Sequence, residues 1–400
     1  MFDFWFKKMM MLKNFFKILM CGVFKCMGVF TKKTIIFESY PELDGSPWML
    51  YQELFSRGYG KKYNLVWAVD SSFICLKPVK CVVFFGELSF FQRLCRFYCK
   101  KNAKLIIDSN RYIYKSNPNT IRLHTRHGGT LKRVDGYSHA IGEIDYILSL
   151  SDEMAEIESS IVYKNAGLNR KQFVSLGYPN NDRLFVPVDQ SIREQMKKLF
   201  GVDYKKIIGW MPTFRKHKSG GRIDCSKKYP FGVPLLYQIE SFERVNAYLK
   251  NKGVLLALKI HHAQLLDFPK VEFSNIKVIP EGFDDLRIPM MDLIKVFDAL
   301  ITDYSSIYHE YLLLDRPIAL SIDDYNEYCE KTGFSIDYFD WIKGVYLNDE
   351  NDLLRFIDEV ADCVDSAKTE RKFTSHRIHK YIDNQSTKRV VDFLEKNAGL

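Results

Sequence analysis

Four groups of polar residues follow short apolar runs of this sequence, at places where reactive side chains can meet a ligand. The first is RHGGTLKR at residues 126–133. Its His127 can take a proton from a hydroxyl near neutral pH, and Gly128 and Gly129 let the backbone approach a ligand closely. Lys132 can hold a phosphate. On spacing alone, a hydrogen-bonded loop histidine without a catalytic role is the alternative.

The second group is MPTFRKHKSGGR at residues 211–222. Thr213 and Arg215 follow an apolar run, and a guanidinium beside a hydroxyl suits a phosphate. The basic, glycine-containing loop after them supplies weaker candidates such as Lys216. A flexible run of solvated charges is the alternative to a phosphate site.

The third group is ALKIHHAQ at residues 257–264, in which Lys259, His261 and His262 end a strongly apolar run. A charged or imidazole side chain at the rim of a sheet is unsuited to pack in an apolar core. We therefore expect these side chains to contact a ligand or to form hydrogen bonds with the backbone. No HExxH, EHxxH or two-histidine-one-carboxylate pattern surrounds them. Metal binding is therefore a minor interpretation.

The fourth group is ITDYSSIYHEY at residues 301–311. Asp303 ends an apolar run, and Ser305 and Ser306 stand where a helix would begin. Serine hydroxyls and free backbone N–H groups at such a place form an anion site, and Glu310, one turn later, can accept hydrogen bonds from a ribose. Simple helix capping by the serines is the alternative.

The elements that position these groups are short apolar runs separated by segments of helical length. Such a pattern indicates parallel strands with helices on both faces of the sheet. The runs span residues 34–39, 63–69, 80–85, 104–109, 121–125, 145–151, 172–179, 206–212, 254–260, 275–280, 298–303, 317–322 and 344–347. We expect an α/β protein with two Rossmann-like, doubly wound domains that face each other across a cleft.

The chain length of 400 residues is typical of two domains. A polar helix at 191–201 marks the boundary, so we expect a first domain at 34–188 and a second at 189–400. We expect the helical stretch from about residue 350 to pack back toward the first domain. Open parallel sheets bind ligands beyond the carboxyl ends of their strands, which places all four polar groups at the cleft.

The net charge, the motifs and the cysteine spacing limit the kinds of molecule that the protein is expected to bind. A net charge of +9 favours acidic partners: nucleic acid, phosphorylated substrates or an anionic membrane face. No RRM, helix-turn-helix or zinc-finger pattern occurs, and no Walker loop, GxGxxG after a strand or GxSxG is present. The nine scattered cysteines form no CxxC pair, which indicates reduced thiols in a cytoplasmic setting and no zinc site.

Residues 1–33 form a basic, aromatic segment with seven lysines and one acid. Lysines 13, 17 and 25 interrupt its apolar run, which is thus shorter than the ~20 residues needed to span a bilayer. We expect an amphipathic helix that lies in the headgroup layer of an anionic membrane. The basic, aromatic segment 90–101 supports the same interpretation. Packing on the protein's own core and signal-anchor insertion are the alternatives.

The four groups, in this order, resemble motifs of the CDP-glycerol glycerophosphotransferase family, which includes teichoic-acid primases and polymerases and related capsule polymerases. RHGGTLKR is similar to (W)HGTPLK, MPTFR to APTWR, KIHH to KLHP, and ITDYSSIYHEY to a DYSS–FDY block. Two further segments, GYPNNDRLF at 177–185 and RPIALSIDDYNEY…KTGFSIDY, are similar to GYPRNDxL and KPI…YDLEEY…RGFYFDY. The resemblance runs from about residue 34 to 345.

This chain departs from those motifs at several positions. Arg126 stands where the family has tryptophan. Gly129 is an extra glycine, which shifts the position that corresponds to the proline of the family motif. His262 replaces proline, and Asn180 replaces an arginine. These departures leave the transferred polyol open.

The resemblance implies a GT-B fold and transfer of a polyol phosphate, such as glycerol phosphate, from a CDP-polyol to a lipid-linked or polymeric glycan in teichoic acid or capsule biosynthesis, with release of CMP. It implies that the first domain binds the acceptor and the second binds the donor. No cofactor and no tightly bound metal are expected; Mg²⁺ is possible but not required. The enzyme would act as a peripheral protein on the cytoplasmic face of the cell membrane, without nucleic acid.

The resemblance also implies roles for individual residues. His127 is the expected general base, and His261 is the second expected catalytic residue, which would stabilise the leaving CMP. The residues expected to bind substrate are Gly128, Thr130, Lys132, Thr213, Arg215, Lys259, Asp303, Ser305, Ser306 and Glu310.

Two other functions fit the same elements. A GT-B glycosyltransferase that uses a nucleotide sugar would release UDP or GDP in place of CMP. A non-catalytic module that binds a nucleotide or an anionic polymer would retain donor binding, show no turnover and tolerate loss of His127.

Deleting residues 1–32 is expected to move the protein from the membrane fraction to the soluble fraction, because the segment supplies apolar and cationic membrane contacts. Sedimentation with vesicles that contain anionic lipid measures the change, and vesicles of neutral lipid are the control. Unchanged sedimentation of the shortened protein with anionic vesicles would contradict the membrane interpretation.

Overall fold

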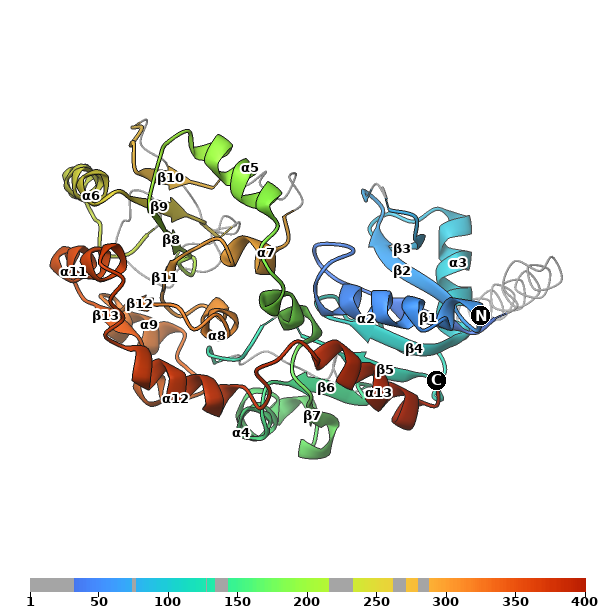
Figure 1. The fold of residues 1–400 in the computed structure, drawn as a ribbon. Helices are drawn as coiled ribbons and strands as arrows, with labels where there is room; N and C mark the ends of the chain where they lie inside the picture. The colour runs from blue at the N-terminus through green and yellow to red at the C-terminus, as the bar shows by residue number, and fades with distance from the viewer. Residues whose placement is uncertain are drawn as a thin grey trace, which may run out of the picture.

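The chain forms two lobes in a computed structural model that describes residues 32–73, 77–126, 128–133, 143–215, 233–261, 271–279 and 288–400 (Figure 1). Most of the basic N-terminal segment lies outside these residues, as do His127, Lys216 and His262. Among the helices of the described part of the chain, none combines the length and the apolar character needed to cross a bilayer.

The first lobe is built on a seven-stranded parallel sheet with the order β3-β2-β1-β4-β5-β6-β7. Its strands are β1 (Thr34–Phe37), β2 (Asn64–Asp70), β3 (Lys80–Phe85), β4 (Ala103–Asp108), β5 (Ile121–His124), β6 (Tyr146–Ser149) and β7 (Phe173–Ser175). The strand order reverses between β1 and β4, which makes a crevice at their carboxyl ends.

The second lobe has a six-stranded parallel sheet with the order β10-β9-β8-β11-β12-β13. Its strands are β8 (Lys206–Trp210), β9 (Val254–Leu258), β10 (Ile276–Val278), β11 (Ala299–Thr302), β12 (Ile318–Ser321) and β13 (Val345–Leu347). All five residues of β9 are buried, as expected for a central strand covered on both faces. The expected parallel α/β architecture is confirmed.

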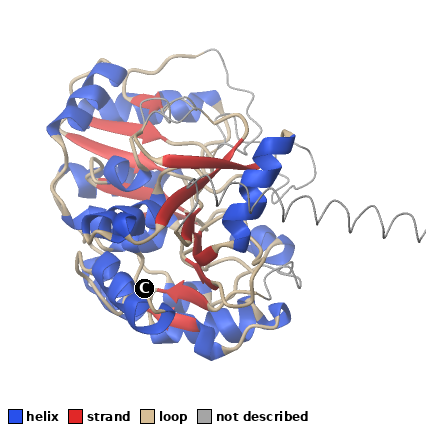
Figure 2. Ribbon diagram, turned by 90° about the vertical axis from the view of Figure 1, so that its right-hand side faces the viewer, coloured by secondary structure: helices blue, strands red, loops and turns tan. Residues whose placement is uncertain are grey.

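Helices lie on both sides of the sheets (Figure 2). In the first lobe they are α2 (Gly45–Ser56), α3 (Phe90–Lys101), α4 (Asp152–Ile157), the π-helical turn η3 (Glu158–Val162) and the 3₁₀ segments η1 (Tyr59–Lys61), η4 (Lys164–Ala166), η5 (Arg170–Gln172) and η6 (Pro179–Phe185). In the second lobe they are α5 (Gln190–Phe200), α6 (Ile239–Lys252), α7 (Met290–Ile294), α8 (Ile307–Leu312), α9 (Tyr325–Lys331) and α10 (Tyr338–Trp341).

Side-chain hydrogen bonds mark the boundaries of two elements. Strand β1 is shorter than the run 34–39 and ends before Glu38, whose buried carboxylate accepts hydrogen bonds from the backbone N–H groups of residues 109–111. Helix α3 begins at Phe90, where Ser89 and Gln92 form a capping box.

The polar stretch after residue 350 forms three helices: α11 (Glu350–Ala361), α12 (Lys368–Ile378) and α13 (Ser386–Ala398). Helix α11 packs against α6, and α12 packs against α8 of the second lobe and α4 of the first. Helix α13 packs against α2 and η6 (Figure 1). The end of the chain therefore returns to the first lobe.

A buried carboxylate of the first lobe holds the start of α13. The two oxygens of Asp182 accept hydrogen bonds from the N–H groups of Ser386 (2.9 Å) and Thr387 (2.8 Å). At the other end of α13, Arg57 of α2 pairs with Asp392 at 2.6 Å and with Glu395 at 3.1 Å. Because the first N–H groups of a helix lack partners within the helix, Asp182 supplies the missing acceptors.

Replacing Asp182 with alanine is expected to destabilise the docking of α13 by about 1–2 kcal/mol, because two N–H groups lose their acceptor. The measurement is the rate at which a protease releases the C-terminal segment, together with the thermal unfolding midpoint. Asp189→Ala is the matched control, since Asp189 accepts from Ser191 at the start of α5 and does not contact α13. Equal rates of release for the two variants would contradict the role of Asp182.

Candidate functional site

The polar groups of the second lobe lie together at one edge of its sheet. Strand β8 stands between β9 and β11, and all three are parallel. The segments that follow these strands therefore meet at the same edge, which brings together residues 211–215, 259–261 and 303–306. On the first lobe, β5 leads into the loop that contains residues 128–133.

The loop of residues 128–133 is docked on the second lobe through its backbone. The Ser335 N–H donates to the Leu131 carbonyl at 2.9 Å, and the Arg133 N–H donates to the Gly333 carbonyl at 3.1 Å. The Ser335 hydroxyl donates to the carbonyl of Lys132 at 2.8 Å. Lys132 and Phe334 form an antiparallel bridge, so the two segments pair with a defined register.

Gly128 lies against Ser306, and this contact joins two of the predicted substrate-binding residues across the lobes. Its φ of +154° lies in a region that side chains rarely adopt. A Cβ atom at this position would lie 2.6 Å from Oγ of Ser306. Both the backbone conformation and the space therefore require glycine. His127, which precedes Gly128 in the chain, lies outside the described residues, and its role as a base stays a prediction.

Arg126 connects the loop of residues 128–133 to the rest of the first lobe. Its φ is +60°, an uncommon value for a residue other than glycine. Its guanidinium pairs with buried Glu158 and also donates to the hydroxyl of Thr130, four residues later in the chain. Burial raises the pKa of Glu158, and the charge of Arg126 opposes that shift. Thr130 is buried beside Arg126, and its contact with substrate stays a prediction.

A buried cluster of charges fixes the edge of the second sheet. Arg215 is 2% exposed and pairs with Asp303 at 2.7 Å and with Asp324 at 2.6 Å. Asp303 also accepts from the N–H of Thr213 at 2.9 Å. The guanidinium also stacks near the rings of Tyr304 and Tyr328. The cluster ties the segments after β8, β11 and β12 together.

These pairs show what Arg215, Asp303 and Thr213 do in the fold, and their predicted contacts with phosphate stay predictions. The hydroxyl of Thr213 is buried and has no hydrogen-bond partner among the described residues. Sequence reasoning gave no role to Asp324 or to Glu158. Asp324 lies in a segment that resembles a family motif, but the spacing did not reveal its arginine partner.

Other predicted residues lie closer to the surface of this edge. Ser305, Ser306 and Lys259 are half-buried. The backbone N–H of Lys259 donates to the carbonyl of Trp210 at 2.9 Å. His261 is exposed, with its ring 5.1 Å from the ring of Phe214. Hydroxyl, ammonium and imidazole groups at one rim can surround a negatively charged ligand.

Glu310 lies below this rim and is buried. Burial raises the pKa of its carboxyl from 4.5 to about 8, although the nearby charge of Arg126 lowers it. The group is therefore mostly neutral at pH 7, and a protonated carboxyl can donate as well as accept a hydrogen bond. The predicted contact of Glu310 with a ribose stays a prediction, since the side chain is covered in this structure.

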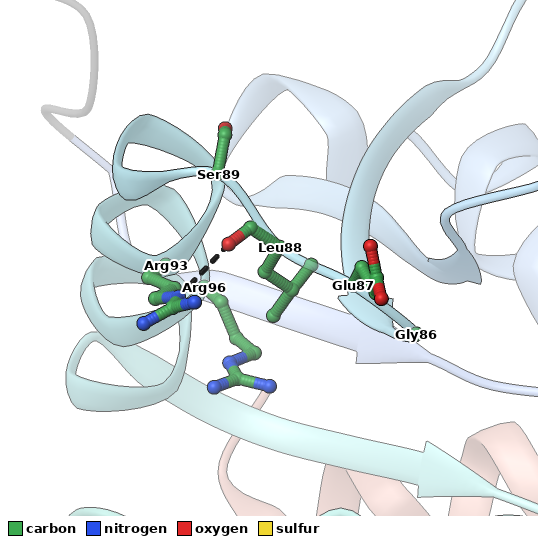
Figure 3. A pocket seen from close by; sticks show the side chains of 6 residues that line it. All are labelled: Gly86, Glu87, Leu88, Ser89, Arg93 and Arg96. Carbon is green, nitrogen blue, oxygen red and sulfur yellow. Dashed lines mark hydrogen bonds between the residues drawn. The ribbon is translucent and has the colours of Figure 1, made fainter.

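A separate hollow lies between the end of β3 and the start of α3 (Figure 3). Its volume is about 650 Å³, and its lining residues are Gly86, Glu87, Leu88, Ser89, Arg93 and Arg96. Arg93 donates to the carbonyl of Leu88 at 2.9 Å and Arg96 donates to that of Phe84 at 2.8 Å.

The neighbouring surface of α3 is apolar. Phe90 and Phe91 are exposed by 55% and 64%. Leu94, on the same helix, is buried.

Metal ligands do not cluster in the described part of the chain, where no group of three His, Cys, Asp or Glu residues has the arrangement of a metal site. Cys95, Cys99, Cys329 and Cys363 are free thiols.

Glu310→Gln is expected to flatten the pH dependence of stability. The folded-state pKa of Glu310 lies above its unfolded value, so its stabilising contribution is present below about pH 4.5 and is lost as the pH rises through about 8. The unfolding midpoint of the unmodified protein should therefore fall, relative to Glu310→Gln, between pH 5 and about pH 9. Glu153→Gln, at an exposed surface pair, is the control. Parallel midpoint curves for the unmodified protein and Glu310→Gln would contradict a buried, proton-binding carboxyl.

The sequence profile of the family described as CDP-Glycerol:Poly(glycerophosphate) glycerophosphotransferase matches residues 20–396 of this chain. The chain is 25% identical over 344 residues to a teichoic acid poly(glycerol phosphate) polymerase of Bacillus spizizenii, with 79% of this chain and 81% of the polymerase covered. It is 25% identical over 408 residues to a teichoic acid glycerol-phosphate transferase of Staphylococcus aureus, with 93% and 96% covered.

A solved structure of the wall teichoic acid polymerase TagF is similar in fold. The TM-score is 0.68 at 19% sequence identity, and the match covers 97% of this chain and 98% of the TagF chain. This likeness supports the GT-B-like arrangement of two parallel sheets. Since the family profile spans most of the sequence, the chain belongs to the CDP-Glycerol:Poly(glycerophosphate) glycerophosphotransferase family and is a transferase.

Proposed function

We propose that this enzyme transfers glycerol phosphate from CDP-glycerol to a hydroxyl of a lipid-linked or polymeric glycan acceptor of the teichoic acid type. A related capsule polymer would present the same hydroxyl chemistry. The observation that carries the proposal is the contact of Gly128 with Ser306, which joins the loop after β5 to the donor-side serines. His127 is the residue next to Gly128 in the chain.

In the proposed reaction, the acceptor hydroxyl oxygen attacks the β-phosphorus of CDP-glycerol. A new phosphorus–oxygen bond forms to the acceptor, and the bond between that phosphorus and the bridging oxygen of the pyrophosphate breaks. CMP leaves with the bridging oxygen, and His127 takes the acceptor proton. Phosphoryl transfer of this kind depends mainly on positioning and on neutralising negative charge.

The residues at the rim of the second lobe are suited to the donor. We propose that Ser305, Ser306 and His261 contact the pyrophosphate and that His261 stabilises the leaving CMP. Lys259 and Lys132 would add positive charge from the two lobes. We assign Arg215 and Asp303 a further role in this proposal, which is to hold the rim in place through their buried ion pair. We propose no cofactor and no tightly bound metal for this transfer, with Mg²⁺ possible but not required.

We also propose that the enzyme works at the cytoplasmic face of the membrane. Exposed Phe90 and Phe91 lie beside Arg93 and Arg96 on α3, a combination that suits an anionic lipid surface. The basic segment of residues 1–33 precedes the first strand of the same lobe. A lipid-linked acceptor would be reached from this position.

His127→Ala is expected to reduce CMP release from CDP-glycerol by about 10²–10⁴-fold, because a general base supplies about that factor. The assay uses membrane extract as acceptor, follows CMP by chromatography and identifies the product by mass. A panel with CDP-ribitol, UDP-sugars and GDP-sugars tests the donor, and a parallel reaction with EDTA tests the metal requirement. His376→Ala, which changes an exposed histidine of α12, is the matched control.

Three results would contradict the proposal. Loss of less than about tenfold in His127→Ala would exclude the role as base. Release of UDP or GDP in place of CMP would indicate a nucleotide-sugar glycosyltransferase, and donor binding without any turnover would indicate a binding module.

A further inference from the structure

A second glycine of the docked loop faces a buried histidine of the opposite lobe. Gly129 lies on the first lobe, and His309 is the third residue of α8 on the second. A Cβ atom at position 129 would lie 2.8 Å from Cγ and 2.5 Å from Cε1 of the imidazole, and closer still to Nδ1. Real Cβ atoms do not approach other atoms so closely, so the imidazole occupies the space that a side chain at 129 would need.

The constraint identified at Gly129 is one of space. The φ of Gly129 lies outside the left-handed region, unlike that of Gly128 at +154°. The three atoms nearest to a Cβ at position 129 all belong to the ring of His309, so this ring is the first obstacle that an alanine would meet. The pair thus differs from Gly128, where both the backbone and Ser306 demand glycine.

The imidazole of His309 is enclosed by other residues and does not form hydrogen bonds with the described ones. The residue is fully buried, and neither Nδ1 nor Nε2 has a hydrogen-bond partner among the described residues. Burial lowers its pKa to about 3, and His379 and Arg126 add to that shift, so the ring is neutral. The backbone of His309 is fixed separately, because its carbonyl accepts from Nε2 of His379 at 2.8 Å.

This environment argues against a simple packing role for the ring. A buried polar atom without a partner destabilises a fold, whereas an apolar side chain of similar size would fill the space without that cost. The ring nonetheless lies against Gly129, two residues after His127 in the chain. Its shape limits how closely the loop approaches α8.

We propose that Gly129 and His309 are a matched interlobe pair that positions the loop of His127 over the donor-side serines. His309 is then a positioning residue of the transfer reaction, acting through the loop. The proposal rests on the proposed function for its catalytic consequence, but the contact itself concerns only the fold.

The pair makes a specific prediction for kinetics. A methyl group at position 129 pushes the loop away from α8, and a displacement of about 1 Å at a reacting group can cost about 100-fold in rate. Gly129→Ala should therefore lower kcat for CMP release by at least about tenfold, with a smaller change in KM for CDP-glycerol. His309→Ala should lower kcat less, because the loop loses its support without being displaced.

The experiment is a double-mutant cycle with Gly129→Ala, His309→Ala and the double variant, measured by kcat, KM and thermal unfolding midpoint. The double variant should have a kcat at least about tenfold above that of Gly129→Ala, because the missing ring makes room for the methyl group. Gly60→Ala is the matched control, since a Cβ there meets Phe55 at an ordinary 3.7 Å. Its kcat and midpoint should match those of the unmodified enzyme.

The outcomes separate the two proposals. Full activity of Gly129→Ala, or equal losses in Gly129→Ala and the double variant, would overturn the matched pair. A Gly129→Ala protein that unfolds, while the double variant folds and releases CMP, supports it. If the unmodified enzyme turns over no CDP-polyol, the proposed function and the positioning role both fail, and recovery of the unfolding midpoint in the double variant would support the steric contact alone.

Discussion

The contact between the lobes depends on a loop that approaches the second lobe with its backbone. Gly128 faces Ser306 without room for a side chain, and residues 131–133 pair with residues 333–335 through main-chain hydrogen bonds. Backbone pairing fixes a register, whereas side-chain packing tolerates small shifts. A loop held in this way can keep its polar side chains at a constant distance from the edge of the opposite sheet.

Buried ion pairs support this contact on both sides. Arg126 and Glu158 lie beneath the loop on the first lobe, and Arg215 joins Asp303 and Asp324 on the second. Buried ion pairs add little net stability, because removing charges from water offsets their attraction. Their directional hydrogen bonds are better understood as fixing where strand ends and loops lie. The site is therefore rigid at its base, while Ser305, Ser306, Lys259 and His261 remain nearer the surface.

The sequence predicted the strands well, because a central parallel strand is a short apolar run with polar residues after it. The run 206–212 contains β8, and 254–260 contains β9. The stretch after residue 350 was harder to divide, because α12 and its neighbours carry many charges and turn between lobes. Nothing local in the sequence indicates that α13 starts on Asp182, which lies more than two hundred residues earlier.

The sequence indicated which segments form the site, but it did not reveal the roles of most single residues. Arg215 was expected to meet phosphate, but its partner Asp324 is 109 residues away in the chain and only the fold brings them together. Gly129 was noticed as an extra glycine, yet its relation to His309 depends on how closely two lobes approach. Such distances follow from tertiary packing, which short-range patterns do not encode.

The most direct test of the account is a crystal structure of the enzyme with CDP-glycerol bound. The β-phosphate is expected to lie at the edge of the second sheet beside Ser305 and Ser306. The position of the acceptor oxygen should lie within about 3–3.5 Å of both the phosphorus and the imidazole of His127. A donor bound elsewhere, or an imidazole of His127 directed away from that phosphate while residues 128–133 stay docked, would contradict it.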